Sequence, residues 1–217
     1  MATEPCADGS ADRRRVILLA GPSGSGKSTL VRAVGLPMVF LDDFYRPGSD
    51  PNLPRHPELG IVDWDDPLSW DDRGAFDALR TLCRTGACEV PMYDFAADGP
   101  RGTRMVQVGT GPFVAEGIFA PQLVGMLRSA GLLLDAIVIV RDPWKNLVRR
   151  AARDLRERRK PPGTILRRGW QLYGREPDIV AAAVAAGARP RSAAQTRAAL
   201  HAYAEAYAGA DSGRPRR

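Results

Sequence analysis

The chain has 217 residues, 44% of them hydrophobic and 26% charged, with a formal net charge of +6. These values fit one folded domain and exclude a disordered chain. No apolar run is long enough to cross a bilayer, and residues 1–14 have no secretory-type apolar segment, so we expect a flexible leader over 1–14 and a cytoplasmic protein. The odd number of cysteines (Cys6, Cys83 and Cys88), without a CxxC spacing, predicts reduced thiols.

The positive charge is concentrated in the last third of the chain. Residues 1–140 carry 13 basic and 18 acidic groups, a net charge of −5, whereas residues 141–217 carry 18 basic and 7 acidic groups, a net charge of +11. Such a basic segment can bind nucleic acid, bind a polyanionic ligand, or form a solvated helix surface. Charge alone does not separate these interpretations.

Short apolar runs alternate with helical patterns along the chain. The expected strands are 16–20, 38–41, 89–93, 112–115 and 136–140, and the expected helices between them are 68–85, 121–129 and 143–159. Two Ala-rich helices follow, one within 175–188 that breaks at Gly187 and one over 192–210. This order predicts an α/β domain over 15–210 with a parallel sheet covered on both faces, followed by a basic tail over 211–217.

The first strand leads into the glycine-rich stretch GPSGSGKST. It matches G-x-x-x-x-G-K-[ST] completely, between an expected strand and an expected helix that begins near Ser28. Backbone N–H groups of such a loop surround an anion, the lysine reaches the β- and γ-phosphates, and the serine hydroxyl can ligate Mg²⁺. The alternative is a glycine-rich turn with a purely structural role. The expected ATP-binding residues are Gly21, Ser23, Gly24, Ser25, Gly26, Lys27, Ser28 and Thr29.

Carboxylates follow two other strands of the expected sheet. Asp42 and Asp43 come directly after strand 38–41, and Glu116 comes directly after strand 112–115. Ligands of open parallel sheets gather at the carboxyl ends of the strands, so these carboxylates should lie beside the phosphate loop. A Mg²⁺ ion and an acceptor hydroxyl both need acidic partners there. The alternative is that these acidic residues simply begin surface loops.

Several further motifs carry a family resemblance. GPSGSGKST, LDDFYR, DWDDPLSWD, VPMYDF, VAEGI and RRAARDLRERRK occur in the order, and near the spacing, of the uridine kinase (uridine–cytidine kinase) family of P-loop kinases. The chain resembles that family over about residues 15–173. The resemblance implies a three-layer fold with a central parallel sheet and a helical Arg-rich lid at about 149–165. It also implies phosphorylation of the 5′-hydroxyl of uridine or cytidine by Mg²⁺·ATP.

The resemblance assigns roles to the acidic residues. Asp42 looks like the general base that takes the proton of the acceptor hydroxyl, and Ser28 and Glu116 look like partners of Mg²⁺, with Asp42 also near the metal. Asp65 is similar to the aspartate that holds the ribose hydroxyls, since one carboxylate can accept from two vicinal O–H groups. The alternative for Asp65 is an acidic turn before the following helix.

The resemblance also implies a pocket for the base, and here the chain departs from the family. Tyr93 and Phe95 look like the aromatic residues that pack on the base, and Tyr45 is expected beside them. Asp98 stands where the family carries a histidine that reads the pyrimidine edge. An ionised aspartate only accepts hydrogen bonds, so it cannot donate to a uracil carbonyl but could accept from an amino group such as that of cytosine.

The arginine-rich segment would form the lid that closes over ATP. Arg150 and Arg153 best match the two helical arginines of the family, and Arg158 and Lys160 match cations further along. Arg153 and Arg158, with Asp42 and Lys27, are the expected catalytic residues. Arg150 and Lys160 are expected to contact substrate. The alternative is a solvated, arginine-rich helix surface.

Other functions stay open at this point. The chain could be a kinase for another small hydroxyl substrate such as pantothenate or glycerate, an ATPase, or a nucleotide-binding module associated with RNA. The last explains the basic segment but not Asp42, Asp65 and the pair Tyr93 and Phe95. We expect a nucleoside triphosphate and a small-molecule acceptor as partners, with neither a membrane nor a nucleic acid, and leave open whether the chain forms a homo-oligomer.

Overall fold

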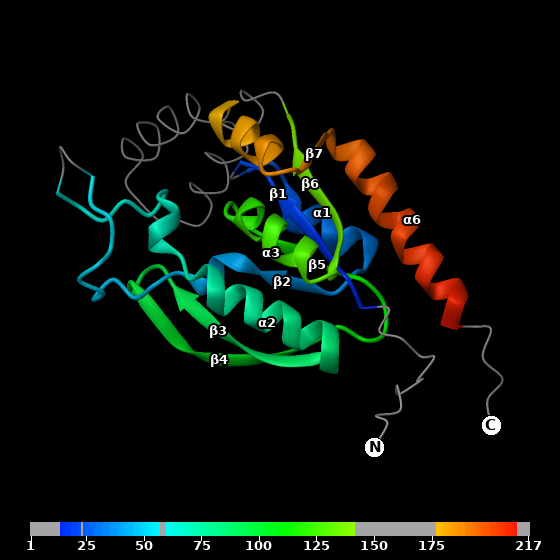
Figure 1. The fold of residues 1–217 in the computed structure, drawn as a ribbon, viewed down its shortest axis with the longest axis horizontal. Coiled ribbons are helices and arrows are strands. Elements are labelled where there is room, and N and C mark those ends of the chain that lie inside the picture. Colours follow the sequence, from blue (N-terminus) through cyan, green and yellow to red (C-terminus); the bar gives the residue numbers. More distant parts are fainter. Residues whose placement is uncertain (1–13, 23, 57–59, 142–176, 212–217) are drawn as a thin grey trace, which may run out of the picture.

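The computed structural model describes residues 14–22, 24–56, 60–141 and 177–211, except for the side chains of 208–211. Its centre is a sheet of five strands that are all parallel, in the order β2-β5-β1-β6-β7 (Figure 1). The predicted parallel sheet is therefore confirmed. The strands are β1 Val16–Ala20, β2 Met38–Phe40, β5 Phe113–Glu116, β6 Leu133–Ile139 and β7 Arg189–Arg191.

Helices cover both faces of the sheet because successive side chains of a strand point to opposite faces. On β1, Leu18 packs into a core with α2 and α3, whereas Ile17 and Leu19 pack into a second core with α1 and α6. The predicted three layers follow from this alternation. The helices are α1 Lys27–Val34, α2 Asp72–Thr85, α3 Val124–Ser129, α6 Ala193–Asp211 and a helix over 177–185, with 3₁₀ turns η1 Leu41–Phe44, η2 Pro67–Ser69 and η3 Ala120–Leu123.

Most predicted elements form with small shifts at their ends. The strand expected over 38–41 stops at Phe40, since Leu41 begins η1, and the helix expected over 68–85 is divided into η2 and α2. Asp71 causes that division because its side chain accepts from Gly74 N (2.9 Å) and caps α2. The helix of 177–185 ends before Gly187, which has a φ of 98°. The helix expected over 143–159 lies outside the described residues.

The strand expected over 89–93 forms, but it is not part of the central sheet. β3 (Ala87–Asp94) pairs antiparallel with β4 (Gly99–Gln107), a strand that was not predicted, and this hairpin lies beside α2 (Figure 1). Only Val106 of β4 is buried, so β4 lacks the alternation of apolar residues that identifies a strand. β7 was also missed, because its three residues Arg-Pro-Arg offer no apolar signal.

A buried carboxylate attaches the last elements to the sheet. Asp135 on β6 is only 4% exposed, and its Oδ1 accepts from Arg189 Nε (3.0 Å) while its Oδ2 accepts from the hydroxyl of Tyr203 (2.8 Å). Burial, together with this hydrogen bond, raises the pKa of Tyr203. Because a buried charge needs partners, Asp135 links β7 and α6 to β6.

Two other sequence expectations concern the cysteines and membrane-spanning helices. Cys83 and Cys88 are free thiols, as predicted, and Cys6 lies outside the described residues. Among the residues that the structure describes, we find no helix with both the length and the apolar character needed to span a membrane.

Arg14, at the end of the expected leader, is held by the folded domain. Its Nε donates to Cys83 O (2.9 Å), its Nη1 to Gly109 O (3.2 Å) and its Nη2 to Arg84 O (3.2 Å). Two of these carbonyls belong to the last turn of α2, where intrahelical donors are lacking. A cation at a helix C-terminus is also favoured by the helix dipole.

We therefore expect Arg14→Met to lower the free energy of unfolding by about 1 to 2 kcal/mol, because three carbonyls lose a charged donor. Urea denaturation followed by circular dichroism measures this loss. The matched control is Arg80→Met on the surface of α2, whose exposed ion pair with Asp77 (2.9 Å) should contribute about 0.5 kcal/mol. Equal losses in the two variants would contradict the capping role of Arg14.

Candidate active site

The glycine-rich loop connects β1 to α1 at the carboxyl edge of the sheet. Gly26 caps α1 with φ 86°, a left-handed conformation that favours glycine. The side chain of Lys27 folds back over the loop, and its Nζ donates to Gly21 O (2.8 Å) and Pro22 O (3.4 Å). Ser25 is fully buried. The loop thus places a lysine ammonium and the N-terminus of an eight-residue helix at one point, an arrangement suited to phosphate.

Glu116 joins this loop from the neighbouring strand. In the sheet register, Glu116 of β5 lies opposite Leu19 on one side and Phe40 on the other. It is 7% exposed, its Oε1 accepts from Ser28 Oγ (2.6 Å), and its Oε2 lies 3.9 Å from Lys27 Nζ. The structure therefore brings Lys27, Ser28 and Glu116 together at the edge where the sequence placed them.

Gly117 lets the turn that carries Asp42 approach the end of β5. A Cβ at Gly117 would lie 2.8 Å from Leu41 Cβ and 3.0 Å from Asp42 Oδ1. Real Cβ atoms essentially never come that close to another heavy atom, so a side chain at this position would push η1 away. The glycine after Glu116 thus sets the distance between the two carboxylates at the site.

The charge on Asp42 is unfavourable in this position. Desolvation by surrounding protein raises the pKa of Asp42 to about 6, and the carboxylate of Glu116 adds to the increase, while the Lys27 ammonium lowers the pKa. By its solvent-accessible surface, however, Asp42 is an exposed residue. Water there screens part of the charge, so the free-energy cost is smaller than the pKa shift alone implies.

Five aromatic side chains form a cluster beside the turn of Asp42. Tyr45 lies at its centre, with ring centroids 5.7 Å from Trp64, 5.7 Å from Tyr93, 5.5 Å from Phe95 and 5.8 Å from Phe119. Burial raises the pKa of Tyr93 to about 12, with a further contribution from Asp98. The structure brings together the three aromatics expected from the sequence.

Sequence reasoning missed Trp64 and Phe119 as members of this cluster. Their positions in the sequence could have indicated this role, because Trp64 directly precedes Asp65 and Phe119 lies two residues after Gly117. Each therefore belongs to a loop that the motifs already identified.

Asp65 and Asp98 border the aromatic cluster through their neighbours in the chain. Asp65 is exposed, and its N–H donates to Asp63 Oδ1 (3.1 Å) in a turn where Asp66 caps η2. Asp98 is exposed at the end of the β3–β4 hairpin, has φ 49°, and accepts from Gly48 N (2.6 Å) through its backbone oxygen. The carboxylate of Asp98 acts on the Tyr93 hydroxyl, since it contributes to the raised pKa of Tyr93.

Part of the predicted site lies outside the described residues. This holds for the lid at 149–165 and for five single residues. They are Ser23 of the phosphate loop and Arg150, Arg153, Arg158 and Lys160 of the arginine-rich segment.

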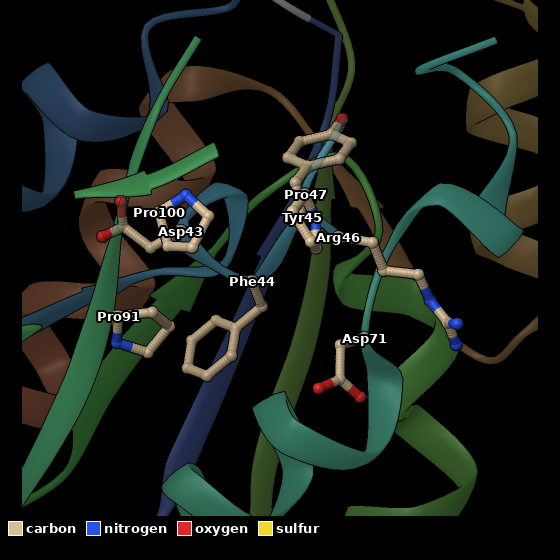
Figure 2. Close-up of a pocket in the computed structure, with 8 residues that line it drawn as sticks. All are labelled: Asp43, Phe44, Tyr45, Arg46, Pro47, Asp71, Pro91 and Pro100. Carbon is tan, nitrogen blue, oxygen red and sulfur yellow. The ribbon is translucent and has the colours of Figure 1, made fainter. Parts of the chain in front are cut away.

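A pocket of about 410 Å³ lies next to η1, the turn that carries Asp42 (the catalytic turn of the proposal below), and is distinct from the glycine-rich loop (Figure 2). Phe44 stands at its centre, with Asp43 on the side of the hairpin and Asp71 at the start of α2. Neither Asp42 nor any residue of the glycine-rich loop lines it. The lining residues are Asp43, Phe44, Tyr45, Arg46, Pro47, Asp71, Pro91 and Pro100.

Comparison with known proteins decides the family. A uridine kinase of Deinococcus deserti is 30% identical over 164 residues, which cover 70% of this chain and 73% of the relative. The chain belongs to the uridine kinase family. Uridine kinases of Bacillus pumilus (28% over 159 residues, 70% of this chain and 72% of the relative) and Borreliella burgdorferi (24% over 159 residues, 70% and 73%) are also similar to it. No protein-family profile matches the chain.

A solved structure supports the fold alone. A kinase assigned to a fructose transport system of Silicibacter sp. TM1040 superimposes with a TM-score of 0.56, covering 85% of this chain and 90% of that chain at 21% identity. With the family relationship, this fold identifies a P-loop kinase, which is a phosphotransferase with an alcohol acceptor. The substrates are a nucleotide and a small molecule.

The raised pKa of Asp42 predicts a stability effect with a defined sign. Between about pH 4 and pH 6 the folded protein binds more protons at Asp42 than the unfolded chain, so stability falls as pH rises through this window. Asp42→Asn removes the charge, and we expect it to raise the melting temperature at pH 8 by about 2 to 4 °C. Near pH 4.5 the difference should be clearly smaller, and it should vanish only below the unfolded pKa of 3.8, where Asp42 is protonated in both the folded and the unfolded protein. An equal shift at both pH values would contradict the assigned pKa.

Proposed function

We propose that the protein transfers the γ-phosphoryl group of Mg²⁺·ATP to the 5′-hydroxyl of a pyrimidine nucleoside. One observation carries this proposal. The turn of Asp42 lies between a phosphate-binding group (Lys27, Ser28 and Glu116) and an aromatic cluster, so a carboxylate stands where an acceptor and a triphosphate would meet. A reaction of this kind would return nucleosides to the nucleotide pool of the cytoplasm.

The residues at the phosphate side fit Mg²⁺. Ser28 Oγ, the Glu116 carboxylate and the Asp42 carboxylate are oxygen donors, and Mg²⁺ binds through one or two carboxylates together with phosphate oxygens and water. A bound Mg²⁺ would neutralise charge on the β- and γ-phosphate oxygens. Lys27 would exchange its hydrogen bonds to Gly21 O and Pro22 O for the same phosphates. Glu116 would then orient the Ser28 hydroxyl.

Asp42 would act as the general base. A carboxyl with a pKa of about 6 is ionised at neutral pH and is more basic than an ordinary aspartate. Its backbone is fixed by Gly117, and the N–H of Ile118 donates to its side chain. Phosphoryl transfer depends mostly on positioning and charge neutralisation, so the fixed direction of the carboxylate matters as much as its basicity.

The aromatic cluster would bind the acceptor base, with Asp65 on the ribose hydroxyls. Aromatic side chains stack on any base, so the choice of base needs a polar contact. Asp98 is exposed at the hairpin beside Tyr93 and supplies a hydrogen-bond acceptor there. Cytosine offers its 4-amino group as a donor, whereas uracil has a carbonyl at that position and donates only from N3–H between two carbonyl oxygens, and we therefore assign cytidine as the preferred acceptor.

The lid over residues 149–165 would complete the site. On the family relationship, Arg153 and Arg158 would stabilise the transferring phosphoryl group, and Arg150 and Lys160 would contact the substrates. In the phosphate loop, Ser23 would contribute its backbone N–H.

The first test measures products from Mg²⁺·ATP and a panel of cytidine, uridine, purine nucleosides, pantothenate and glycerate. We expect a pyrimidine 5′-monophosphate, and we expect Asp42→Asn to keep ATP binding while lowering the chemical step by about 10² to 10⁴-fold. Full turnover in that variant would remove the role of Asp42. A phosphorylated product from another acceptor would replace the pyrimidine assignment. ATP consumption that does not depend on any acceptor would indicate an ATPase instead.

A second test addresses the choice of base. Asp98→His introduces an N–H donor, so we expect the ratio of kcat/KM for uridine to that for cytidine to rise about tenfold or more. Asp98→Asn is the companion variant, because it removes the charge and introduces a donor while changing the size little. A uridine to cytidine ratio that stays constant in both variants would show that Asp98 does not read the base.

A further inference from the structure

We propose that Asp43 and Arg104 position the acceptor-binding hairpin against the turn that carries Asp42. This inference rests on the proposed function, since it assumes that the hairpin binds the acceptor. We call the two side chains and the Tyr93 N–H the Asp43–Arg104 link. Asp43 is here a positioning residue that acts through Asp42 and Tyr93.

Both oxygens of Asp43 bind the hairpin. Oδ2 accepts from Arg104 Nη2 on β4 (2.8 Å), and Oδ1 accepts from the backbone N–H of Tyr93 on β3 (3.2 Å). The carboxylate thus spans both strands of the hairpin at once. Asp43 is only 18% exposed and Arg104 32% exposed, so water screens this pair less than it screens an ordinary surface ion pair.

Arg104 also touches the other side of the catalytic turn. Its guanidinium carbon lies 5.1 Å from the ring centroid of Phe40, the last residue of β2. Arg104 therefore contacts residues on both sides of Asp42 in the chain, Phe40 before it and Asp43 after it. A shift of the hairpin would be transmitted to the backbone on both sides of the carboxylate that we assign as the base.

Apolar packing alone does not hold this part of the hairpin. Val90 and Val106 attach it to the main core beside α2. Nearer to Tyr93, Pro91 and Pro100 of the hairpin line the pocket of about 410 Å³ together with Phe44 (Figure 2). The rings of Tyr93 and Phe95 pack on Tyr45, which follows η1 (centroids 5.7 and 5.5 Å apart), while beside the open pocket polar contacts fix the hairpin against η1 itself. Asp43 lies at the edge of that pocket on the hairpin side.

The remaining polar contacts of the hairpin go to a different segment. Tyr93 Oη donates to Arg46 O (3.3 Å), and Asp98 O accepts from Gly48 N (2.6 Å). Both partners follow the catalytic turn in the chain. Among the polar contacts that the structure records for the described part of the hairpin, the Asp43–Arg104 link is therefore the one that reaches η1 itself.

On our proposal, the link affects binding of the acceptor but not binding of the nucleotide. Lys27 and Ser28 lie on α1 and Glu116 on β5, and these residues make no contact with the link that the structure records. Breaking the link should therefore move Tyr93 and Phe95 relative to Asp42 and leave the nucleotide-binding residues in place. A purely structural ion pair would instead lower stability and affect both substrates alike.

The test compares Arg104→Met with Arg101→Met. Arg101 lies on the same strand and pairs with Asp94 (3.0 Å) within the hairpin, so it does not reach the catalytic turn. In the full chain, we expect Arg104→Met to raise the KM for the nucleoside about 5- to 20-fold, with the KM for ATP changed less than about twofold. Arg101→Met should leave both values within about twofold of the wild type.

Two further variants protect the test against simple misfolding. Arg104→Lys keeps a donor and a charge, and should restore at least half of the lost affinity for the nucleoside. The double variant Asp43→Asn/Arg104→Met should be no worse than the worse single variant, because the two residues act as one unit. Additive losses, or equal losses for ATP and nucleoside, would overturn the proposal.

Hydrogen exchange provides a readout that does not depend on the acceptor. The Tyr93 amide should exchange about tenfold faster in Arg104→Met, but not in Arg101→Met, because Asp43 loses the partner that orients it. If the wild type phosphorylates no nucleoside, the proposed function fails, and unchanged exchange at Tyr93 would independently overturn the link. Faster exchange with an unchanged KM for the nucleoside would show that the link exists but does not position the acceptor.

Discussion

The parallel register of β2, β5 and β1 is the constraint on which the site depends. Glu116 lies level with Leu19 and with Phe40, so the three strands end together, and the glycine-rich loop, Glu116 and Asp42 follow within two residues of those ends. A shift of β5 by one residue would turn Glu116 to the opposite face of the sheet and end its hydrogen bond to Ser28. The buried alternation on β1 between the two cores resists such a shift, because Leu18 would exchange places with Ile17 or Leu19.

This register brings the carboxylates of Glu116 and Asp42 close together, an arrangement that suits catalysis but lowers the stability of the fold. Glu116 is nearly buried, but Lys27 and Ser28 compensate it. For Asp42, desolvation and the carboxylate of Glu116 outweigh the favourable effects of Lys27 and the Ile118 N–H, and its raised pKa reports this unfavourable position. Gly117 permits the close approach that creates this situation. A phosphate group would draw the Lys27 ammonium away from the loop carbonyls, so the electrostatic balance of the two carboxylates depends on what the loop binds.

Sequence reasoning succeeded where the signal is local and failed where it is not. β1, the glycine-rich loop and the start of α1 are read from one contiguous segment, and the carboxylates at the ends of β2 and β5 follow from strand order. β4 and β7 lack an apolar period, so neither was predicted, and β3 was assigned to the wrong sheet because its partner was unseen. Asp43 and Arg104 are 61 residues apart, and neither carries a motif that indicates the other. Their contact exists only once the hairpin is folded against the turn.

The hairpin explains how one fold can keep its phosphate chemistry while its acceptor changes. The residues that we propose for phosphate binding lie on the central sheet and α1, whereas Tyr93, Phe95 and Asp98 lie on a separate antiparallel unit. Substitutions on that unit, such as an aspartate where the family carries a histidine, therefore alter the contacts available to the base without disturbing Lys27, Ser28 or Glu116. The hairpin can change independently of the phosphate-side residues only if the acceptor hydroxyl still reaches Asp42. The ring packing on Tyr45 holds the hairpin near this turn, and the Asp43 carboxylate, directly next to Asp42, binds both strands of the hairpin; on our proposal this contact fixes the distance from the acceptor to Asp42.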